Sequence, residues 1–457
     1  MNTGVPLSDL KNKLLTEFAA FAKGLNGSAT GDIFDARRKA IDAFEVLGFP
    51  TVKNEEWKYT NLSKFISEEW NRSEAIINET EKLSIAIDNI IPKSIESHRL
   101  VFCNGQFRND LSSINPEDNS FIISSFSEAL KNNKALVNEY FGKGLLSDTN
   151  GLTALNTAFA SEGCFIHVPK GVKPKYPVHL INISGGSGEK FMNQVRNLII
   201  IEDGAQLDLI ETYTTIGSNE YLSNIVSEIF VKENAVFNQY RFQLEDVEKA
   251  NQVNFTQITQ QSHSLVNNMT ITLGGKLVRN DLNYKLADKD CESHLFGLYI
   301  GSASQHIDNH TLVDHAMPQC FSNEFYKGIL ADKSTGVFNG KIIVRPDAQK
   351  TNAYQSNKNV LLSDEAHINT KPQLEIFAND VKCSHGATTG QLDDEALFYL
   401  RSRGIGAAEA KAMLTTAFAA DVLENIKLQP LKEYAIQLVT EKLNAITIDH
   451  LPNTKND

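Results

Sequence analysis

Residues 197–209 read Asn-Leu-Ile-Ile-Ile-Glu-Asp-Gly-Ala-Gln-Leu-Asp-Leu, and this stretch contains the pattern that decides the fold. A β-branched run is followed by an acidic turn with a glycine and then by alternating apolar residues, which predicts strand, turn and strand. Similar acidic clusters before a small residue lie at 233–235, 332–336 and 364–366. The small residues at 205 and 235 are 30 apart, and so are those at 336 and 366.

A repeat of this length fits the stacked coils of a parallel β-helix. The alternative is an antiparallel sandwich whose turns happen to be evenly spaced. Short strand-like runs continue from about residue 100 to 376, which would make an unusually large sandwich, so the length favours the β-helix. Long amphipathic helical patterns are absent from this region, which excludes a sheet built from βαβ units.

Both ends of the chain have helical patterns instead. Leu10, Leu14 and Phe18 recur at helical spacing, which predicts a first helix. Further helices are predicted over residues 35–47, 393–403, 407–426 and 431–443. The predicted organisation is therefore a helical domain over 1–95, a β-helix core over 96–388 and a second helical domain over 389–457.

Composition limits the classes of function. The chain of 457 residues has a net charge of -12, which argues against a nucleic-acid binder. Neither a secretion signal nor an apolar run long enough to span a membrane is found. Five cysteines are scattered with no C-x-x-C pair, which is typical of a reducing compartment. We therefore expect a cytoplasmic protein.

Most candidates for chemistry have a simpler structural interpretation. His306, His310 and His315 form the densest imidazole cluster, but the β-branched residues around them predict a strand in which His315 faces away from the other two. Cys164 lies beside an apolar run and is expected to be a buried small hydrophobe. Cys291 and Cys320 are not placed in sequence as a ligand pair. Hydrolase, zincin and P-loop motifs are absent, so an ATP-driven role would need another subunit.

The strongest candidate pair of metal ligands, Cys383 and His385, lies at the boundary between the β-region and the C-terminal helices. In a strand these residues face the same side. A thiolate and an imidazole suit iron, zinc or an iron–sulfur cluster. Two ligands alone make a poor site, so either a partner chain completes it or the pair has no such role.

Several linked blocks resemble the SufB/SufD family of iron–sulfur cluster assembly proteins, most closely its SufD branch. They are Tyr-Lys-Gly-Ile-Leu (326–330), Gly-Val-Phe-Asn-Gly-Lys-Ile (336–342), Ala-Gln-Lys-Thr (348–351), Lys-Pro-Gln-Leu-Glu-Ile (371–376), Asp-Val-Lys-Cys-Ser-His-Gly-Ala-Thr (380–388) and Leu-Phe-Tyr-Leu-Arg-Ser-Arg-Gly-Ile (397–405). Upstream, Glu-Glu-Trp-Lys-Tyr-Thr (55–60) and Leu-Asn-Thr-Ala-Phe (155–159) support the resemblance.

The resemblance implies a right-handed parallel β-helix between helical ends, acting as a scaffold and not as an enzyme. It implies pairing with SufB, or with itself when SufB is absent, and binding of the ATPase SufC on the C-terminal helices. The residues expected to contact SufC are Leu397, Phe398, Tyr399, Arg401, Arg403, Met413 and Phe418. His385 is expected to bind iron or a transient iron–sulfur cluster at the SufB interface, with Cys383 as a secondary candidate. No tightly bound cofactor is expected, and a flavin is neither predicted nor excluded.

Three alternatives remain at this stage. A SufB-type chain would itself carry the nascent cluster, but Gly386 follows His385 where that branch is expected to have a glutamate soon afterwards, and no cysteine-rich segment is present. A polysaccharide-acting β-helix enzyme would need a groove of carboxylates and basic residues, which no segment marks. A homodimeric structural protein without a metal role would not bind SufC.

Overall fold

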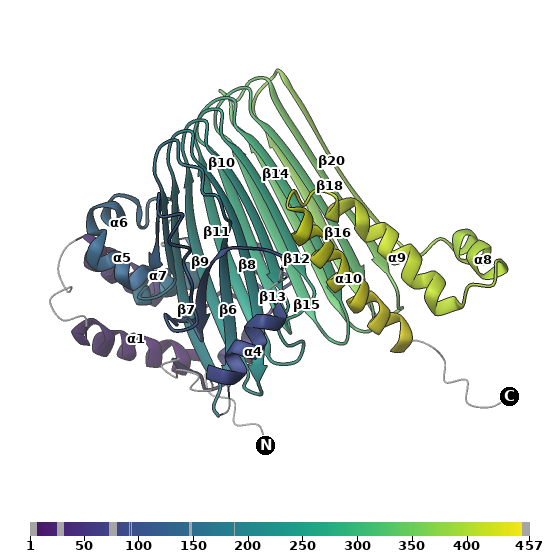
Figure 1. The fold of residues 1–457 in the computed structure, drawn as a ribbon, viewed down its shortest axis with the longest axis horizontal. Coiled ribbons are helices and arrows are strands. Elements are labelled where there is room, and N and C mark those ends of the chain that lie inside the picture. The colour runs from purple at the N-terminus through teal and green to yellow at the C-terminus, as the bar shows by residue number, and fades with distance from the viewer. Residues whose placement is uncertain are drawn as a thin grey trace.

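A computed structural model describes residues 7–24, 32–72, 80–90, 92, 94–145, 149–186 and 188–449. Residues 1–6, part of the N-terminal segment in which no secretion signal was found, lie outside this part of the chain, as do residues 450–457. The predicted parallel β-helix is confirmed: two facing sheets run the length of the molecule (Figure 1).

Each sheet has ten strands, and in the sheet that we call A one of them, β1, lies off the main path. Neighbouring strands are parallel except for the pairs β4–β5 and β2–β3. Sheet A consists of β4 (Ile122–Ser125), β5 (Cys164–Val168), β7 (Phe191–Ile201), β9 (Tyr221–Val231), β11 (Ala250–Gln260), β13 (Leu277–Leu286), β15 (His306–His315), β17 (Thr335–Val344) and β19 (His367–Ile376), with β1 (Asn71–Arg72) beside β7. Sheet B consists of β3 (Gln106–Phe107), β2 (His98–Cys103), β6 (Val178–Gly186), β8 (Gln206–Gly217), β10 (Val236–Gln243), β12 (Leu265–Thr272), β14 (Glu292–Gly301), β16 (Phe321–Leu330), β18 (Thr351–Leu361) and β20 (Val381–Gly390).

Successive strands along the chain belong alternately to sheet A and sheet B. One coil of the β-helix therefore consists of one strand from each sheet and the two turns that connect them. The acidic clusters noticed in the sequence are these turns, and they belong to two different corners. The clusters at 202–205 and 233–235 lead from sheet A to sheet B, whereas those at 332–336 and 364–366 lead from B to A. Gly204, Asn234 and Asp332 have positive φ values of 67°, 57° and 53°. Glycine, asparagine and aspartate tolerate this conformation, which explains why the repeat is visible in the sequence.

The space between the sheets, which we call the bore, is filled by side chains that stack from coil to coil. Ile199, Ile229 and Ile258 are in register on β7, β9 and β11, and each is at most 1% exposed. Burial of one such aliphatic side chain contributes roughly 1.5–3 kcal/mol. Amide ladders run alongside: Asn280 donates to Asn309 at 3.0 Å and accepts from Asn254 at 3.1 Å.

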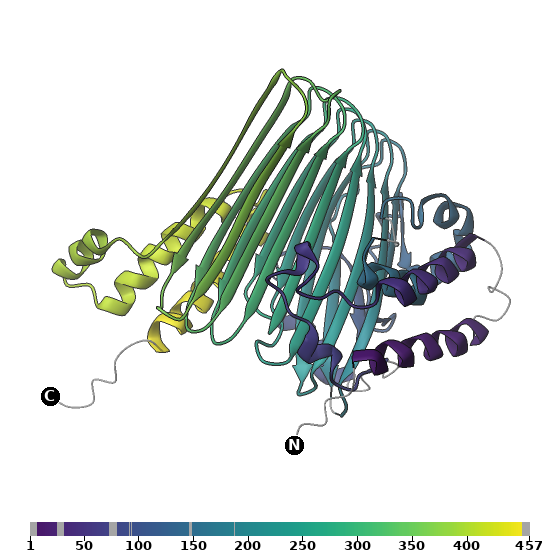
Figure 2. The same ribbon diagram turned by 180° about the vertical axis from the view of Figure 1, so that it is seen from behind.

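Helices flank the β-helix, and the N-terminal ones lie mainly against sheet A (Figure 2). The described elements are α1 (Leu7–Gly24), α2 (Asp32–Leu47), the 3-10 turn η1 (Glu55–Trp57), α3 (Ser63–Ile66) and α4 (Thr80–Ile90). Three short helices that the sequence did not predict lie inside the β-region: α5 (Phe126–Asn132), α6 (Lys134–Tyr140) and α7 (Gly151–Phe159). All nine residues of α7 are buried, including Thr153, Asn156 and Thr157.

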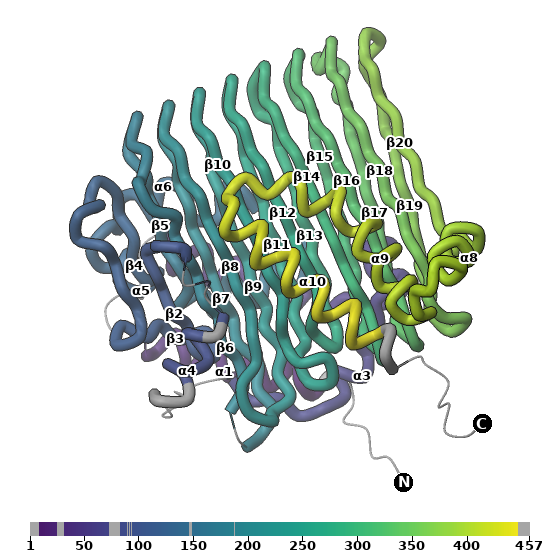
Figure 3. Tube along the Cα trace, turned by 45° about the vertical axis from the view of Figure 1, so that its right-hand side comes forward, coloured from purple at the N-terminus to yellow at the C-terminus, as the bar shows by residue number. Residues whose placement is uncertain are grey.

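The C-terminal helices were predicted to within a few residues, except that the last one is longer at its C-terminal end. They are α8 (Asp394–Ser402), α9 (Ala407–Leu423) and α10 (Gln429–Asp449). Helices α9 and α10 lie across the outer face of sheet B, and α8 lies beyond them near β20 (Figure 3). Among the described residues, no helix is long and apolar enough to cross a membrane.

Candidate functional site

The β-helix ends in two strands that have a neighbour on one side only. In the described part of the chain, β19 pairs with β17 alone and β20 pairs with β18 alone. Most residues of β20 are exposed. The backbone donors and acceptors along these two strands are therefore available to another chain, and we call this edge the open end.

Cys383 and His385 lie on one face of β20, as their spacing predicted, and the structure shows that this face is the one toward the bore. Their register partners on β18 are Ala353 and Gln355, which are buried in the bore. Cys383 packs against the aliphatic residues there, and burial raises the pKa of its thiol. His385 is exposed. The imidazole is thus the accessible group, whereas the thiol is partly covered and held in its protonated form, which is a weak ligand.

This pair cannot by itself surround a metal ion. Across the described residues, no group of three or more His, Cys, Asp or Glu side chains is arranged to hold one. A soft or borderline metal in a tetrahedral site needs about four ligands. The pair therefore offers two possible ligands at an edge that a second chain can cover.

The His306, His310 and His315 cluster divides as predicted, because β15 is a strand. His306 and His310 face outward under residues 54–60, which we call the strap, while His315 faces the bore and bonds to Ser322 at 2.9 Å. Glu55 Oε1 of the strap lies 2.5 Å from Lys371 Nζ on β19 and forms an ion pair with it. The strap thus runs from the N-terminal helices to the penultimate strand of the β-helix.

Charge and aromatic contacts hold the strap in place. Trp57 lies under the guanidinium of Arg279, 3.9 Å from the ring centroid. Arg279 Nη1 donates to Asp308 at 2.7 Å, and His310 Nε2 lies 3.0 Å from the same carboxylate. Burial and the Arg279 charge disfavour the imidazolium, but Asp308 and then Glu56 of the strap outweigh them and raise the pKa of His310 to about 9. This cluster is a buried ionic anchor in which the Arg279 guanidinium lies against both Asp308 and His310.

Two cysteines that looked unrelated in the sequence lie on adjacent coils. Cys291 and Cys320 precede the paired residues Glu292 and Phe321, and both thiols donate to the carbonyl oxygen of Asp288, at 3.1 and 3.2 Å. Hydrogen bonding within this pair lowers the pKa of Cys320 and raises that of Cys291. Both are at most 1% exposed. Cys164 is buried as predicted.

The predicted contact residues on α8 and α9 differ in exposure. Phe398, Tyr399 and Met413 are 74%, 57% and 47% exposed, and Arg403 stacks on the Tyr399 ring at 5.2 Å. Arg401 is exposed as well, while Leu397 is half-buried in a groove with Lys411 and Ile446.

Phe418 points instead toward the β-helix. Its ring lies 4.4 Å from Lys327 Nζ on β16, which also donates to the Phe418 carbonyl and to Asp421, each at 2.7 Å. This contact fastens α9 to sheet B.

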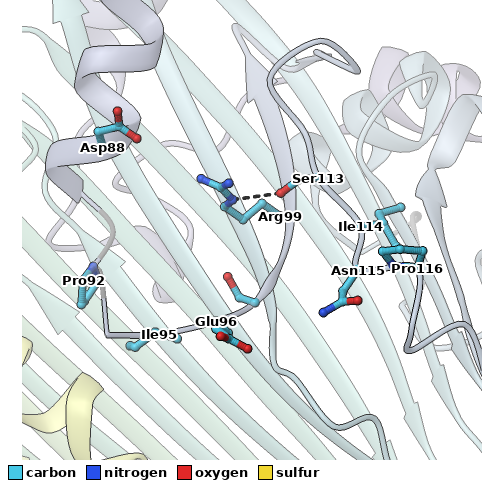
Figure 4. A pocket seen from close by; sticks show the side chains of 10 residues that line it. Asp88, Pro92, Ile95, Glu96, Arg99, Ser113, Ile114, Asn115 and Pro116 are labelled. Carbon is cyan, nitrogen blue, oxygen red and sulfur yellow. Dashed lines mark hydrogen bonds between the residues drawn. The ribbon is translucent and has the colours of Figure 1, made fainter.

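A separate hollow of about 560 Å³ lies near α4 and β2 (Figure 4). Arg99 donates to Ser113 at 3.0 Å across it, and Asp88 and Glu96 lie at its rim. Strand β2 is at the opposite end of sheet B from β20. The hollow is therefore remote from the Cys383 and His385 pair.

Comparisons with known proteins agree over almost the whole chain. Residues 183–418 match the family described as SUF system FeS cluster assembly, SufBD core domain, and residues 8–180 match the SufBD protein N-terminal region. An iron-sulfur cluster assembly SufBD family protein of Synechocystis is 31% identical over 91% of this chain and 92% of its own. The iron-sulfur cluster assembly protein SufD of Escherichia coli is 29% identical over 87% and 90%, and that of Bacillus subtilis 26% over 89% and 93%.

Proposed function

Because this chain belongs to the SufB/SufD family of iron–sulfur cluster assembly proteins, we propose that it is a SufD-type scaffold subunit and not an enzyme. It pairs with SufB through the open end, contributes His385 to a site for the nascent cluster or its iron, and binds the ATPase SufC on α8 and α9.

The observation that carries this proposal is the position of His385. An exposed imidazole lies on the bore-facing side of the last strand, at an edge with unpaired backbone groups. A strand of another chain can add to such an edge by main-chain hydrogen bonds, and its inward side chains then lie beside His385. Tyr354, Ile376 and Phe377 near this edge are 39%, 41% and 62% exposed, which supplies apolar area for the contact.

The SufC surface is supported by exposure and by its attachment to the β-helix. Phe398 and Tyr399 are large side chains without a buried role, as expected for contact residues. Helix α9, which follows α8, is fastened to β16 by Lys327, and β16 is two strands from β20 in sheet B. Movement of SufC during ATP hydrolysis can then act on the open end through α9 and strain or open the interface with SufB.

The test is anaerobic co-expression of this chain with SufB and SufC, followed by purification of the complex. We expect His385→Ala to lower the iron and cluster content of the complex while the complex still assembles. Ser384→Ala is the matched control, because Ser384 is the exposed neighbour that faces the other side of β20. Unchanged iron and cluster content in an assembled His385→Ala complex would show that the role of His385 is wrong.

A further inference from the structure

A column of polar side chains inside the bore leads to His385 from the preceding coils. Glu324 on β16 is in register with Gln355 on β18, and Gln355 is in register with His385 on β20. Neighbouring strands are about 5 Å apart, so each side chain of the column lies against the next. Glu324 and Gln355 are 0% and 3% exposed, which makes a carboxyl and an amide the groups directly behind the imidazole.

Hydrogen bonds fix the inner part of this column. Thr311 donates to Glu324 Oε2 at 2.5 Å, and Gln355 Nε2 donates to the same oxygen at 3.3 Å. Because the amide nitrogen faces the carboxyl, the amide oxygen is free to face another group. Gln355 Oε1 is buried and finds no hydrogen-bond partner among the described residues. An acceptor left without a donor in a buried position is costly, so a donor is expected there.

The coil also leaves room for this amide. Gly340 on β17 faces the bore, and a Cβ at that position would lie 2.3 Å from Gln355 Nε2. Gly340 does not have a positive φ, so the backbone does not require glycine there. The absence of a side chain at 340 is explained by the space that the Gln355 amide occupies.

We propose that Gln355 is a positioning residue for His385: its amide donates inward to Glu324 and accepts a hydrogen bond outward from a ring N–H of His385. This contact selects the tautomer of the imidazole and leaves the other ring nitrogen as the lone-pair donor at the open end. The inference deepens the proposed function and rests on it, because the nitrogen that is left free is the one that would bind iron. The column Thr311, Glu324 and Gln355 is thus the support of a half-site that a partner completes.

The test uses the full chain labelled with ¹⁵N-histidine, with the His385 signals assigned by their loss in His385→Ala. Ring ¹⁵N chemical shifts report the tautomer of a neutral imidazole. In Gln355→Met the acceptor is removed at similar volume, and we expect the His385 tautomer ratio to change about 2- to 10-fold, the range for one hydrogen bond. Gly340→Ala should change it in the same direction, because the added Cβ displaces the amide while the chemistry of residue 355 is kept. It also provides the test if Gln355→Met fails to fold.

Asn357→Leu is the matched control. Asn357 is also buried in the bore on β18, but it is in register with Ala387 and not with His385. Its replacement should leave the His385 signals unchanged. Unchanged His385 shifts in Gln355→Met and Gly340→Ala, or an equal change in Asn357→Leu, would overturn the positioning role.

The iron content of the complex with SufB and SufC separates this inference from the function on which it rests. Gln355→Met should lower it in the direction of His385→Ala. Shifts that change while His385→Ala leaves the iron content unaffected would support the contact and refute the proposed function. If the His385 shifts do not change but the iron content depends on His385, the contact with Gln355 is refuted and the proposed function is supported.

Discussion

The ionic anchor under the strap predicts a specific dependence of stability on pH. The perturbation is His310→Gln, which removes the imidazolium but keeps an amide of similar size beside Asp308. His310 has a pKa of about 9, raised from 6.5 by Asp308 and Glu56 against the effects of burial and of the Arg279 charge. A raised pKa means that the folded state binds the proton more tightly than the unfolded state does. The stabilisation is therefore complete below about pH 6.5 and is lost as the pH rises through about 9.

The magnitude follows from the size of the shift. The difference between 6.5 and about 9, at 1.36 kcal/mol for each unit, corresponds to about 3 kcal/mol. The charge is almost fully buried, with its side chain 9% exposed, so solvent screening removes little of it. Neighbouring groups do not cancel the effect: burial lowers the pKa of His306, and Asp308 stays ionised because its pKa is lowered, with His310 and Arg279 outweighing its burial.

The assay is urea unfolding of wild type and His310→Gln at about pH 6 and about pH 10. We expect the wild type to be more stable by about 3 kcal/mol at the lower pH and this difference to shrink toward zero at the higher pH. An NMR titration of His310 in the folded protein gives its pKa directly. A difference between the two proteins that is the same at both pH values, or a His310 pKa near 6.5, would refute the reasoning.

Three further outcomes are expected. Lys327→Met removes two hydrogen bonds to α9, one to the Phe418 carbonyl and one to the Asp421 carboxylate. Limited proteolysis should then cut the segment after β20 faster than in wild type, and equal cleavage rates would contradict this. Burial raises the pKa of Glu324 from 4.5 to about 7, so the folded protein loses stability as the pH rises between these two values. The unfolding free energy of Glu324→Gln should therefore gain about 3 kcal/mol on that of wild type between about pH 4.5 and pH 8. If urea unfolding gives the same difference between the two proteins at both pH values, the reasoning is wrong. Phe398→Ala with Tyr399→Ala should weaken SufC binding at least about tenfold in a pull-down or titration without changing the melting temperature, and retained affinity would show that SufC binds elsewhere.

The β-helix could be predicted from the sequence because acidic and small residues recur at its turns. Several turns between strands contain a residue in the left-handed conformation, and Gly204, Asn234 and Asp332 supply it beside acidic residues. Most of the flanking helices were predicted from the helical spacing of their apolar residues and from their end signals, but α4 was not. Helix α7 was not predicted: it has nine residues and lies inside a region whose other segments read as strands.

What the sequence could not provide is register. Cys291 and Cys320 are brought together because the coil between them has one particular length. The same holds for Gln355, which lies behind His385 only through the pairing of β18 with β20. The contact of Glu56 with His310 joins residues far apart in the chain and has no local signal at all. Chemistry-bearing residues are thus recognisable from type and spacing, but their neighbours follow from the stacking.

The central claim is that His385 binds the nascent cluster or its iron in a site shared with SufB. The most direct measurement labels only this chain with ¹⁵N-histidine, assembles it with unlabelled SufB and SufC, and records pulsed EPR of the reduced, paramagnetic cluster. We predict a ¹⁵N hyperfine coupling of a directly bound imidazole nitrogen that disappears in His385→Ala and persists in Ser384→Ala. A complex that carries the cluster but shows no histidine nitrogen coupling from the labelled chain would contradict the account.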